Sequence, residues 1–260
     1  MRVILYLTLI TSCLGWMGCP SRQTVVTQRT APQTLPIWAS LTPFEKRTTQ
    51  AFRTSSDTET LLRMALLLSG SRTEQQVRPL VAKFKVFLEG VKPVVTKISK
   101  HEQRAKMLFQ LFHKRLLYTK VKPYKTTFVT HQTRVDKTLR TGLFNCVSSS
   151  VLYGILANHF GYTVEGVSLP YHVFVQLKHP SFSKPIEVET TTYYGFGKKH
   201  DQKYYQRQRQ FWQPTYGTRA PTYSDYKRRK FFNLKRLISR LSFLQHTHPS
   251  KMSESTRYRL

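Results

Sequence analysis

The sequence predicts an α+β fold, in which a helical N-terminal part precedes a cysteine-bearing helix packed on an antiparallel β-sheet. Apolar residues recur at three- and four-residue steps through the first half of the chain, which is typical of helices. Near residue 163 the pattern changes to an alternation of apolar and polar residues, which is typical of strands. One helix followed directly by several strands favours an antiparallel sheet.

The composition is that of a folded but strongly basic protein. The chain has 260 residues, of which 40% are hydrophobic and 13% aromatic, and this excludes a wholly disordered protein. Its 42 Lys and Arg against 13 Asp and Glu give a net charge of +29. A surface of this charge attracts polyanions, such as nucleic acid, anionic lipid or an acidic envelope polymer. The charge alone does not select among them.

Residues 1–19 are interpreted as a signal peptide. Arg2 precedes an apolar run that is short for a membrane span and ends in small residues before Cys19. The pair Gly18-Cys19 resembles a bacterial lipoprotein cleavage site, at which Cys19 would be acylated. The protein is therefore expected to be exported to the bacterial cell envelope or periplasm, with Cys19 as a candidate lipid anchor. A buried N-terminal helix or an uncleaved anchor is the alternative.

Three further regions follow the signal. Residues 20–50 are predicted to be a tether, because their first part is polar, contains proline and shows no periodicity. Residues 51–197 are predicted to form the folded domain with its helical lead-in. Residues 198–260 are predicted to form a basic, aromatic-rich C-terminal tail, with sixteen Lys or Arg against three acidic residues.

Helix start and stop signals divide the lead-in into three helices. The predicted helices are residues 55–70 with a capping box at Ser56 and Glu59, residues 77–88 before Gly90, and a third helix that starts with a capping box at Ser99 and Glu102. Residues 118–139 are polar and basic, so they are predicted to form a loop. These helices are assigned to the core and to no chemistry.

The next part of the chain carries the cysteine helix and the strands. A helix is predicted to begin at Cys146 and to end at Gly161. The predicted strands are residues 163–168, 172–178 and 186–191. In the tail, residues 226–245 are predicted to form one basic amphipathic helix, which could lie on an anionic lipid surface. We predict no cofactor and no metal, since no glycine-rich phosphate loop is present and His246 and His248 are isolated.

The lone thiol suggests chemistry. Cys13 leaves with the signal and Cys19 lies at the terminus, so Cys146 is left without an internal disulfide partner. A small buried side chain without a chemical role is the plain alternative. At the start of a helix, the unpaired N–H groups and the helix dipole favour a thiolate. The N–H of Cys146 would also face a developing oxyanion.

A nucleophilic thiol needs a base and a group that orients the base. His172 opens the second predicted strand, just after the turn. Glu187 and Glu189 lie two residues apart on the third strand and therefore on one face. In an antiparallel sheet, a carboxylate at the end of the third strand approaches a histidine at the start of the second. The order and spacing of the three residue types are more specific than any one of them.

Residues 144–191, from "FNCVSSS" through "LPYHVFVQLK" to "IEVETT", resemble the core of the transglutaminase-like (papain-like thiol) superfamily. That core places Cys at the start of a helix, His on a following strand and Asp on the next. The resemblance implies that Cys146 is the nucleophile, His172 the base and Glu189 the third member, in place of the usual Asp. The helical lead-in is more loosely similar to the SirB1-type bacterial branch.

The leading hypothesis is an exported thiol acyl-transfer enzyme, a peptidase, amidase or transamidase that acts on a peptide or peptidoglycan-like amide. Hydrolysis and transamidation both stay open, because the acceptor depends on the access of water. One alternative is an inactive binding module of the envelope on the same scaffold. The other is a basic protein of the membrane surface or of nucleic acid. The export signal and the lack of a nucleic-acid-binding motif make nucleic acid the less favoured partner.

Overall fold

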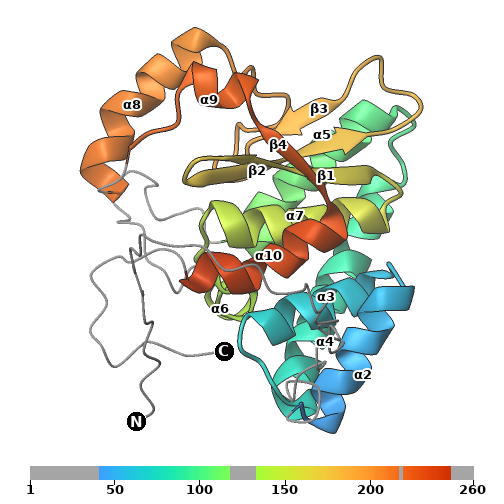
Figure 1. Ribbon diagram of the computed structural model, residues 1–260. Coiled ribbons are helices and arrows are strands. Elements are labelled where there is room, and N and C mark those ends of the chain that lie inside the picture. The colour runs from blue at the N-terminus through green and yellow to red at the C-terminus, as the bar shows by residue number, and fades with distance from the viewer. Residues whose placement is uncertain (1–40, 118–132, 217–218, 247–260) are drawn as a thin grey trace, which may run out of the picture. The chain divides into compact units, whose positions relative to one another are not determined.

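The computed structural model describes residues 41–117, 133–216 and 219–246, and it confirms the predicted α+β class (Figure 1). The predicted signal peptide, Cys19, and the tether up to residue 40 lie outside these ranges. The helices are α2 (Pro43–Thr54), α3 (Thr58–Leu68), α4 (Glu74–Val95), α5 (His101–Leu111), the π-helix η1 (Phe112–Leu116), α6 (Val135–Thr141), α7 (Cys146–His159), α8 (Gln202–Tyr216), α9 (Tyr223–Lys227) and α10 (Leu234–His246). The strands are β1 (Thr163–Leu169), β2 (His172–Lys178), β3 (Ile186–Val188) and β4 (Lys230–Asn233).

The four strands form one antiparallel sheet in the order β3-β2-β1-β4. The tight turn between β1 and β2 pairs Leu169 with His172, and it holds Tyr171 at a φ of +59°, in the left-handed region. Few non-glycine residues adopt this conformation, so the turn is strained immediately before the predicted base. The register of β3 pairs Val188 with Val175, so the residue after β3 comes level with Phe174, two residues from the start of β2.

Helices cover one face of the sheet, and an aromatic cluster lies on the other (Figure 1). On one face, α7 packs against β1 and β2, and α10 packs against β1, α3 and α7. Every residue of α7 from Cys146 to Ala157 is buried, which is expected of a helix enclosed on all sides. On the other face, a small aromatic core joins Phe174 to Tyr204 and Tyr205 of α8. The cysteine helix is thus the central element of the main core.

Several predicted boundaries are wrong. The helix predicted over 55–70 is capped by Asp57, which accepts from the Thr60 N–H, and not by a box of Ser56 and Glu59. The helix predicted after Ser99 is α5, which begins at His101. Its N-cap residue, Lys100, makes no side-chain hydrogen bond to the helix, so the predicted capping box of Ser99 and Glu102 is also wrong. In α3, the carboxylate of Asp57 caps the helix in place of the neighbouring Ser56. In α5, no side chain caps the helix, and burial of its apolar face fixes its position.

The lead-in contains more helix than the sequence predicts. α2 begins inside the predicted tether, because its side chains at Phe44 and Phe52 are buried in the main core. α4 continues through Gly90, since Val91 and Val95 beyond it are fully buried and outweigh a glycine cost of about 1 kcal/mol. α6 occupies the end of the predicted loop, of which residues 118–132 lie outside the described ranges.

The C-terminal segment predicted to be one helix is instead a helix, a strand and a helix. β4 pairs with β1, with Phe232 opposite Gly166, and adds the fourth strand to the sheet. Helical spacing of apolar residues begins only at Leu234, and α10 then places Ile238 and Leu241 in the main core. Within the described ranges, no helix is long and apolar enough to cross a membrane.

The packing of α10 against α3 and α7 should contribute to the stability of the fold. Ile238 is fully buried, so Ile238→Ala should lower the free energy of unfolding by about 2–5 kcal/mol. Arg236, which is exposed on the same helix, provides the control, and Arg236→Ala should change the free energy of unfolding by less than about 1 kcal/mol. Urea denaturation of the full chain measures both. Equal, small effects of the two substitutions would show that this segment does not belong to the core.

Candidate active site

The thiol lies at the first residue of α7, and a capping box fixes that position. Asn145 Oδ1 accepts from the Val147 and Ser148 N–H groups at 3.0 and 3.2 Å, and Ser148 Oγ accepts from the Asn145 N–H at 3.2 Å. The Asn145 amide also donates to Thr133 Oγ1 at 2.7 Å. The cap does not use the Cys146 N–H, so this group remains at the helix start beside the thiol. Cys146 itself is buried, with 8% of its surface exposed.

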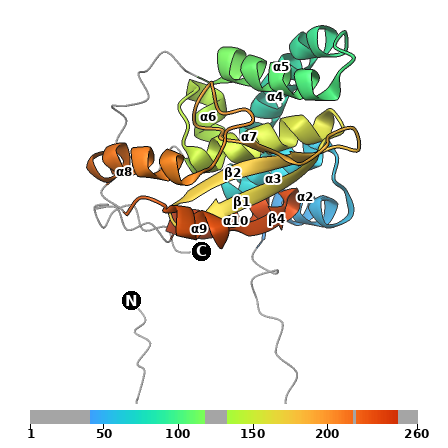
Figure 2. The same ribbon diagram turned by 90° about the horizontal axis from the view of Figure 1, so that it is seen from above.

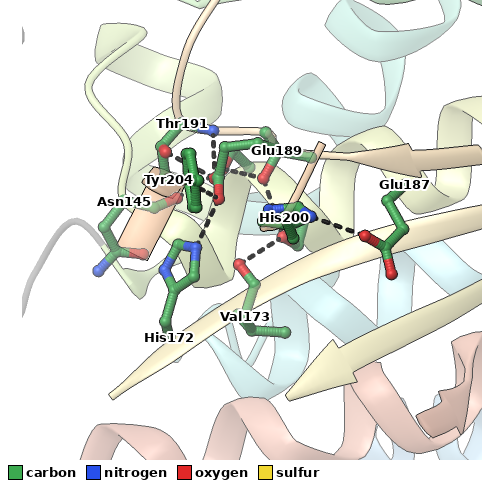
Figure 3. A network of polar contacts seen from close by, with 11 residues as sticks. Asn145, His172, Val173, Glu187, Glu189, Thr191, His200 and Tyr204 are labelled. Carbon is green, nitrogen blue, oxygen red and sulfur yellow. Dashed lines mark hydrogen bonds and ion pairs between the residues drawn. The ribbon is translucent and has the colours of Figure 1, made fainter. Parts of the chain in front are cut away.

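The structure brings His172 and Glu189 into direct contact (Figure 3). His172 is the first residue of β2 and Glu189 follows the last residue of β3. The imidazole Nε2 donates to the Glu189 Oε2 at 2.6 Å, and the two side chains are only 8% and 2% exposed. The antiparallel pairing of β2 and β3 therefore produces the approach that the sequence predicts.

Glu189 is surrounded by donors. Besides His172, Thr191 donates to Oε1 from its hydroxyl at 2.6 Å and from its backbone N–H at 3.2 Å. The Tyr204 hydroxyl donates to Oε2 at 3.5 Å. Burial alone would raise the pKa of this carboxyl, but the charge of His172 and the hydrogen bonds of His172 and Thr191 lower it to about 2. Glu189 is therefore ionised at neutral pH.

The imidazole is correspondingly charged. Burial lowers the pKa of His172, but the charge of Glu189, the adjacent Cys146 thiol and the hydrogen bond to Glu189 raise it to about 10. Because Glu189 engages Nε2, Nδ1 is the nitrogen left for the Cys146 thiol. His172 at neutral pH is thus an imidazolium between a carboxylate and a thiol.

A buried hydroxyl network ties the Glu189 loop to the cysteine helix. Thr190 is fully buried, and its hydroxyl shares hydrogen bonds of 2.9 Å with both Ser149 and Ser150. Ser149 also donates to the Asn145 carbonyl at 2.7 Å, and Ser150 donates to the Val173 carbonyl at 3.3 Å. These bonds replace a longer third strand: the prediction of strand over residues 189–191 is wrong, because Thr190 turns toward α7.

The backbone of the same loop closes tightly on itself. The Glu189 N–H donates to the Gly195 carbonyl at 3.0 Å. A Cβ on Gly195 would lie 1.8 Å from the Glu189 carbonyl oxygen, so only glycine fits there. The position of the acid is thus set by the hydroxyl network on one side and by this loop closure on the other.

The second candidate acid, Glu187, has different partners. Its carboxylate accepts from His200 Nδ1 at 2.7 Å (Figure 3). It also accepts from the Tyr226 hydroxyl at 3.0 Å. His200 is buried and stacks on Phe174, with the ring centroids 4.3 Å apart. Of the two glutamates that the sequence leaves open, Glu189 contacts His172 and Glu187 holds the aromatic core beneath α8 and α9.

A fully buried histidine that the sequence did not indicate lies behind the site. His113 of η1 packs edge-on against Phe109, Phe144 and Tyr193, so it touches the segments that precede Cys146 and follow Glu189. Burial lowers the pKa of His113 to about 4, against opposing contributions from the Thr190 backbone and the Glu189 charge. It is therefore neutral at pH 7.

The sequence indicates some of the residues that support the site, but not all of them. Asn145 followed three residues later by Ser148 is a readable capping pattern directly at the thiol. Tyr204 carried no signal, because it lies in the segment predicted to be a tail. No cluster of three or more His, Cys, Asp or Glu that could hold a metal occurs within the described ranges. The arrangement offers a nucleophile, a proton carrier and its fixed counter-charge.

Comparisons of the chain with models of known protein families, with curated proteins and with solved structures found no match.

The first prediction for the site concerns the His172–Glu189 pair. In Glu189→Gln the imidazole stays buried but loses its counter-charge, so the pKa of His172 should fall from about 10 to about 6.5 or below. Glu187→Gln is the matched control, because Glu187 bonds to His200 and should leave the pKa of His172 unchanged. NMR titration of the histidine ring signals measures both. An equal fall in the two variants would contradict the assignment.

A second prediction concerns His113 and acid. In the unfolded chain His113 takes up a proton near its ordinary pKa of about 6.5, whereas in the folded protein its pKa is about 4. Stability should therefore fall by up to about 3 kcal/mol as the pH drops from 6.5 to 4, and then level off. His113→Phe should remove this part of the pH dependence in urea denaturation between pH 7 and 4. An unchanged slope in the variant would refute it.

Proposed function

We propose that the protein is a thiol acyl-transfer enzyme with a transglutaminase-like core, in which Cys146 is the nucleophile, His172 the proton carrier and Glu189 the orienting acid. The observation that carries the proposal is the buried 2.6 Å contact between His172 and Glu189 next to a thiol at a helix N-terminus. A structural cysteine needs no such neighbours. Two charges are costly to bury, and this pair lies where a thiol enzyme needs it.

The chemistry follows from the charges. The imidazolium and the helix N-terminus stabilise a Cys146 thiolate, which attacks the carbonyl carbon of an amide. The Cys146 N–H stabilises the oxyanion that forms. As the carbon–nitrogen bond breaks, His172 gives its proton to the departing amine, and a thioester remains. Water or a second amine then attacks the thioester, His172 takes up the proton of that nucleophile, and the thiolate leaves.

Glu189 has a positioning role in this scheme. Its four donors fix the carboxylate, and the carboxylate fixes the ring so that Nδ1 faces the thiol. The longer Glu in place of the usual Asp of the superfamily fits a loop in which the acid lies beyond the strand end. The predicted export places this activity in the bacterial envelope, where peptides and peptidoglycan stems supply amides. An inactive envelope binding module is the competing proposal.

The test supplies amides of both kinds to the full chain. With a tryptic digest of casein as substrate, new amino groups report peptide hydrolysis and ammonia reports attack on glutamine side chains. Adding a primary amine separates transamidation from hydrolysis through amine incorporation. Cys146→Ala should lower the rate at least about 1,000-fold. Glu187→Gln should keep it within about threefold, because that glutamate contacts neither His172 nor the thiol.

Two outcomes would overturn the proposal. Equal rates in the wild-type chain and Cys146→Ala would remove the nucleophile. A wild-type chain that releases neither amino groups nor ammonia, yet retains casein peptides in equilibrium dialysis, would support the binding module instead.

A further inference from the structure

The strongest unexplained feature outside the site is a basic surface on the C-terminal elements. Residues 226–246 contain seven Lys or Arg and no Asp or Glu. We define the β4–α10 surface by Lys227, Arg228, Arg229, Lys230, Lys235, Arg236 and Arg240. These residues lie at the end of α9, in the two-residue connection after it, on β4, which is an edge strand of the sheet, and on α10 (Figure 1).

Aromatic rings hold several of these charges in place. The Arg229 guanidinium lies 4.1 Å from the ring centroid of Tyr226, and that of Arg240 lies 3.9 Å from the centroid of Phe232. Arg236 lies over the same Phe232 ring at 5.2 Å. Because the side chains rest on fixed rings, they lose less freedom when they bind an anion. The surface is therefore organised in advance for a negatively charged partner.

Most of this charge is not neutralised within the protein. Arg228 and Arg229 reach Asp225 and Glu187 at 3.6 Å. In the described ranges, no carboxylate lies within ion-pair distance of Lys230, Lys235, Arg236 or Arg240. Folding alone does not account for a cluster of like charges on one edge, since such charges repel one another.

The apolar face of α10 restricts how this surface can bind. The sequence suggested an amphipathic helix lying on lipid, which requires a free apolar face. In the fold that face is used, because Leu237, Ile238 and Leu241 are buried in the main core against α3 and α7. Insertion of α10 into a bilayer would therefore require unfolding. What remains exposed is the charge, together with Phe231, which is 44% exposed.

We propose that the β4–α10 surface docks the folded protein onto the phosphate groups of an anionic phospholipid membrane, peripherally and without insertion of α10. Guanidinium and ammonium groups bind phosphate oxygens strongly, and basic clusters of this size bind anionic bilayers. Among the residues of β4 and α10 whose burial the structure describes, Phe231 is the one large apolar side chain that is substantially exposed, whereas single-stranded nucleic acid is bound by a series of stacking rings. The proposal is independent of the acyl-transfer activity.

The test compares two triple variants of the full chain carrying Cys19→Ser, so that no lipid can be attached. One variant is Lys227→Glu, Lys230→Glu and Arg236→Glu. Arg236 is the third residue of α10 behind the Asn233 cap, where Glu is favourable, so this change should not harm the helix. The matched control is Lys97→Glu, Lys106→Glu and Lys114→Glu. These three lysines are exposed, and their replacement changes the net charge by the same amount. α5 and β4 lie on opposite sides of α7 (Figure 2).

Binding is measured by co-sedimentation with vesicles of phosphatidylglycerol and phosphatidylcholine in equal parts. The β4–α10 variant should bind at least about tenfold more weakly, and the control variant should stay within about threefold of the starting chain. Binding should also weaken steeply with added salt. Thermal melting checks the fold, and if the Glu variant is unfolded, the same three positions changed to Gln give a milder test with the same expected order.

Three results would overturn the proposal. The two variants could lose binding equally, which would assign it to the overall charge. Vesicles of phosphatidylcholine alone could bind as well, which would remove the role of phosphate charge. Finally, a single-stranded oligonucleotide could bind more tightly than the vesicles and be lost in the β4–α10 variant alone, which would assign the surface to nucleic acid.

Discussion

The buried ion pair of His172 and Glu189 is the constraint on which the rest of the structure depends. Removing two charges from water costs several kcal/mol for each, and only close partners and further hydrogen bonds offset that cost. Thr191 and Tyr204 supply the additional donors, and Thr190 fixes the loop to α7. The short β3, the serines of α7 and the position of α8 are all arranged around this one contact.

Sequence reasoning succeeded where a residue pattern decides the structure locally. Cys146 opens a helix because Asn145 caps it, and β1 and β2 form where apolar and polar residues alternate. The same alternation in "IEVETT" predicted too long a strand, because Thr190 finds its partners on α7, far away in the sequence. A tertiary hydrogen bond of this kind leaves no periodic signal.

The candidate site was predictable as a set of residue types, but its support was not. His172 and Glu189 follow from strand order and antiparallel pairing. The choice of Glu189 over Glu187 is not predictable in this way, because it depends on the hydrogen bond between His200 and Glu187. The C-terminal segment hid a strand in "KFFN" because seven basic residues dominated its pattern. Once α10 is docked in the core, the same charges are left on the outside. The candidate site and the basic edge therefore lie on different elements of the fold.

The most direct test of the central claim is the rate of alkylation of Cys146 by iodoacetamide in the folded chain, measured at pH 7 in the starting chain and in two variants. Because the His172 imidazolium lies beside the thiol, His172→Gln should lower the rate at least about tenfold, and Glu187→Gln should keep it within about threefold. Equal rates in the starting chain and in His172→Gln would contradict the account.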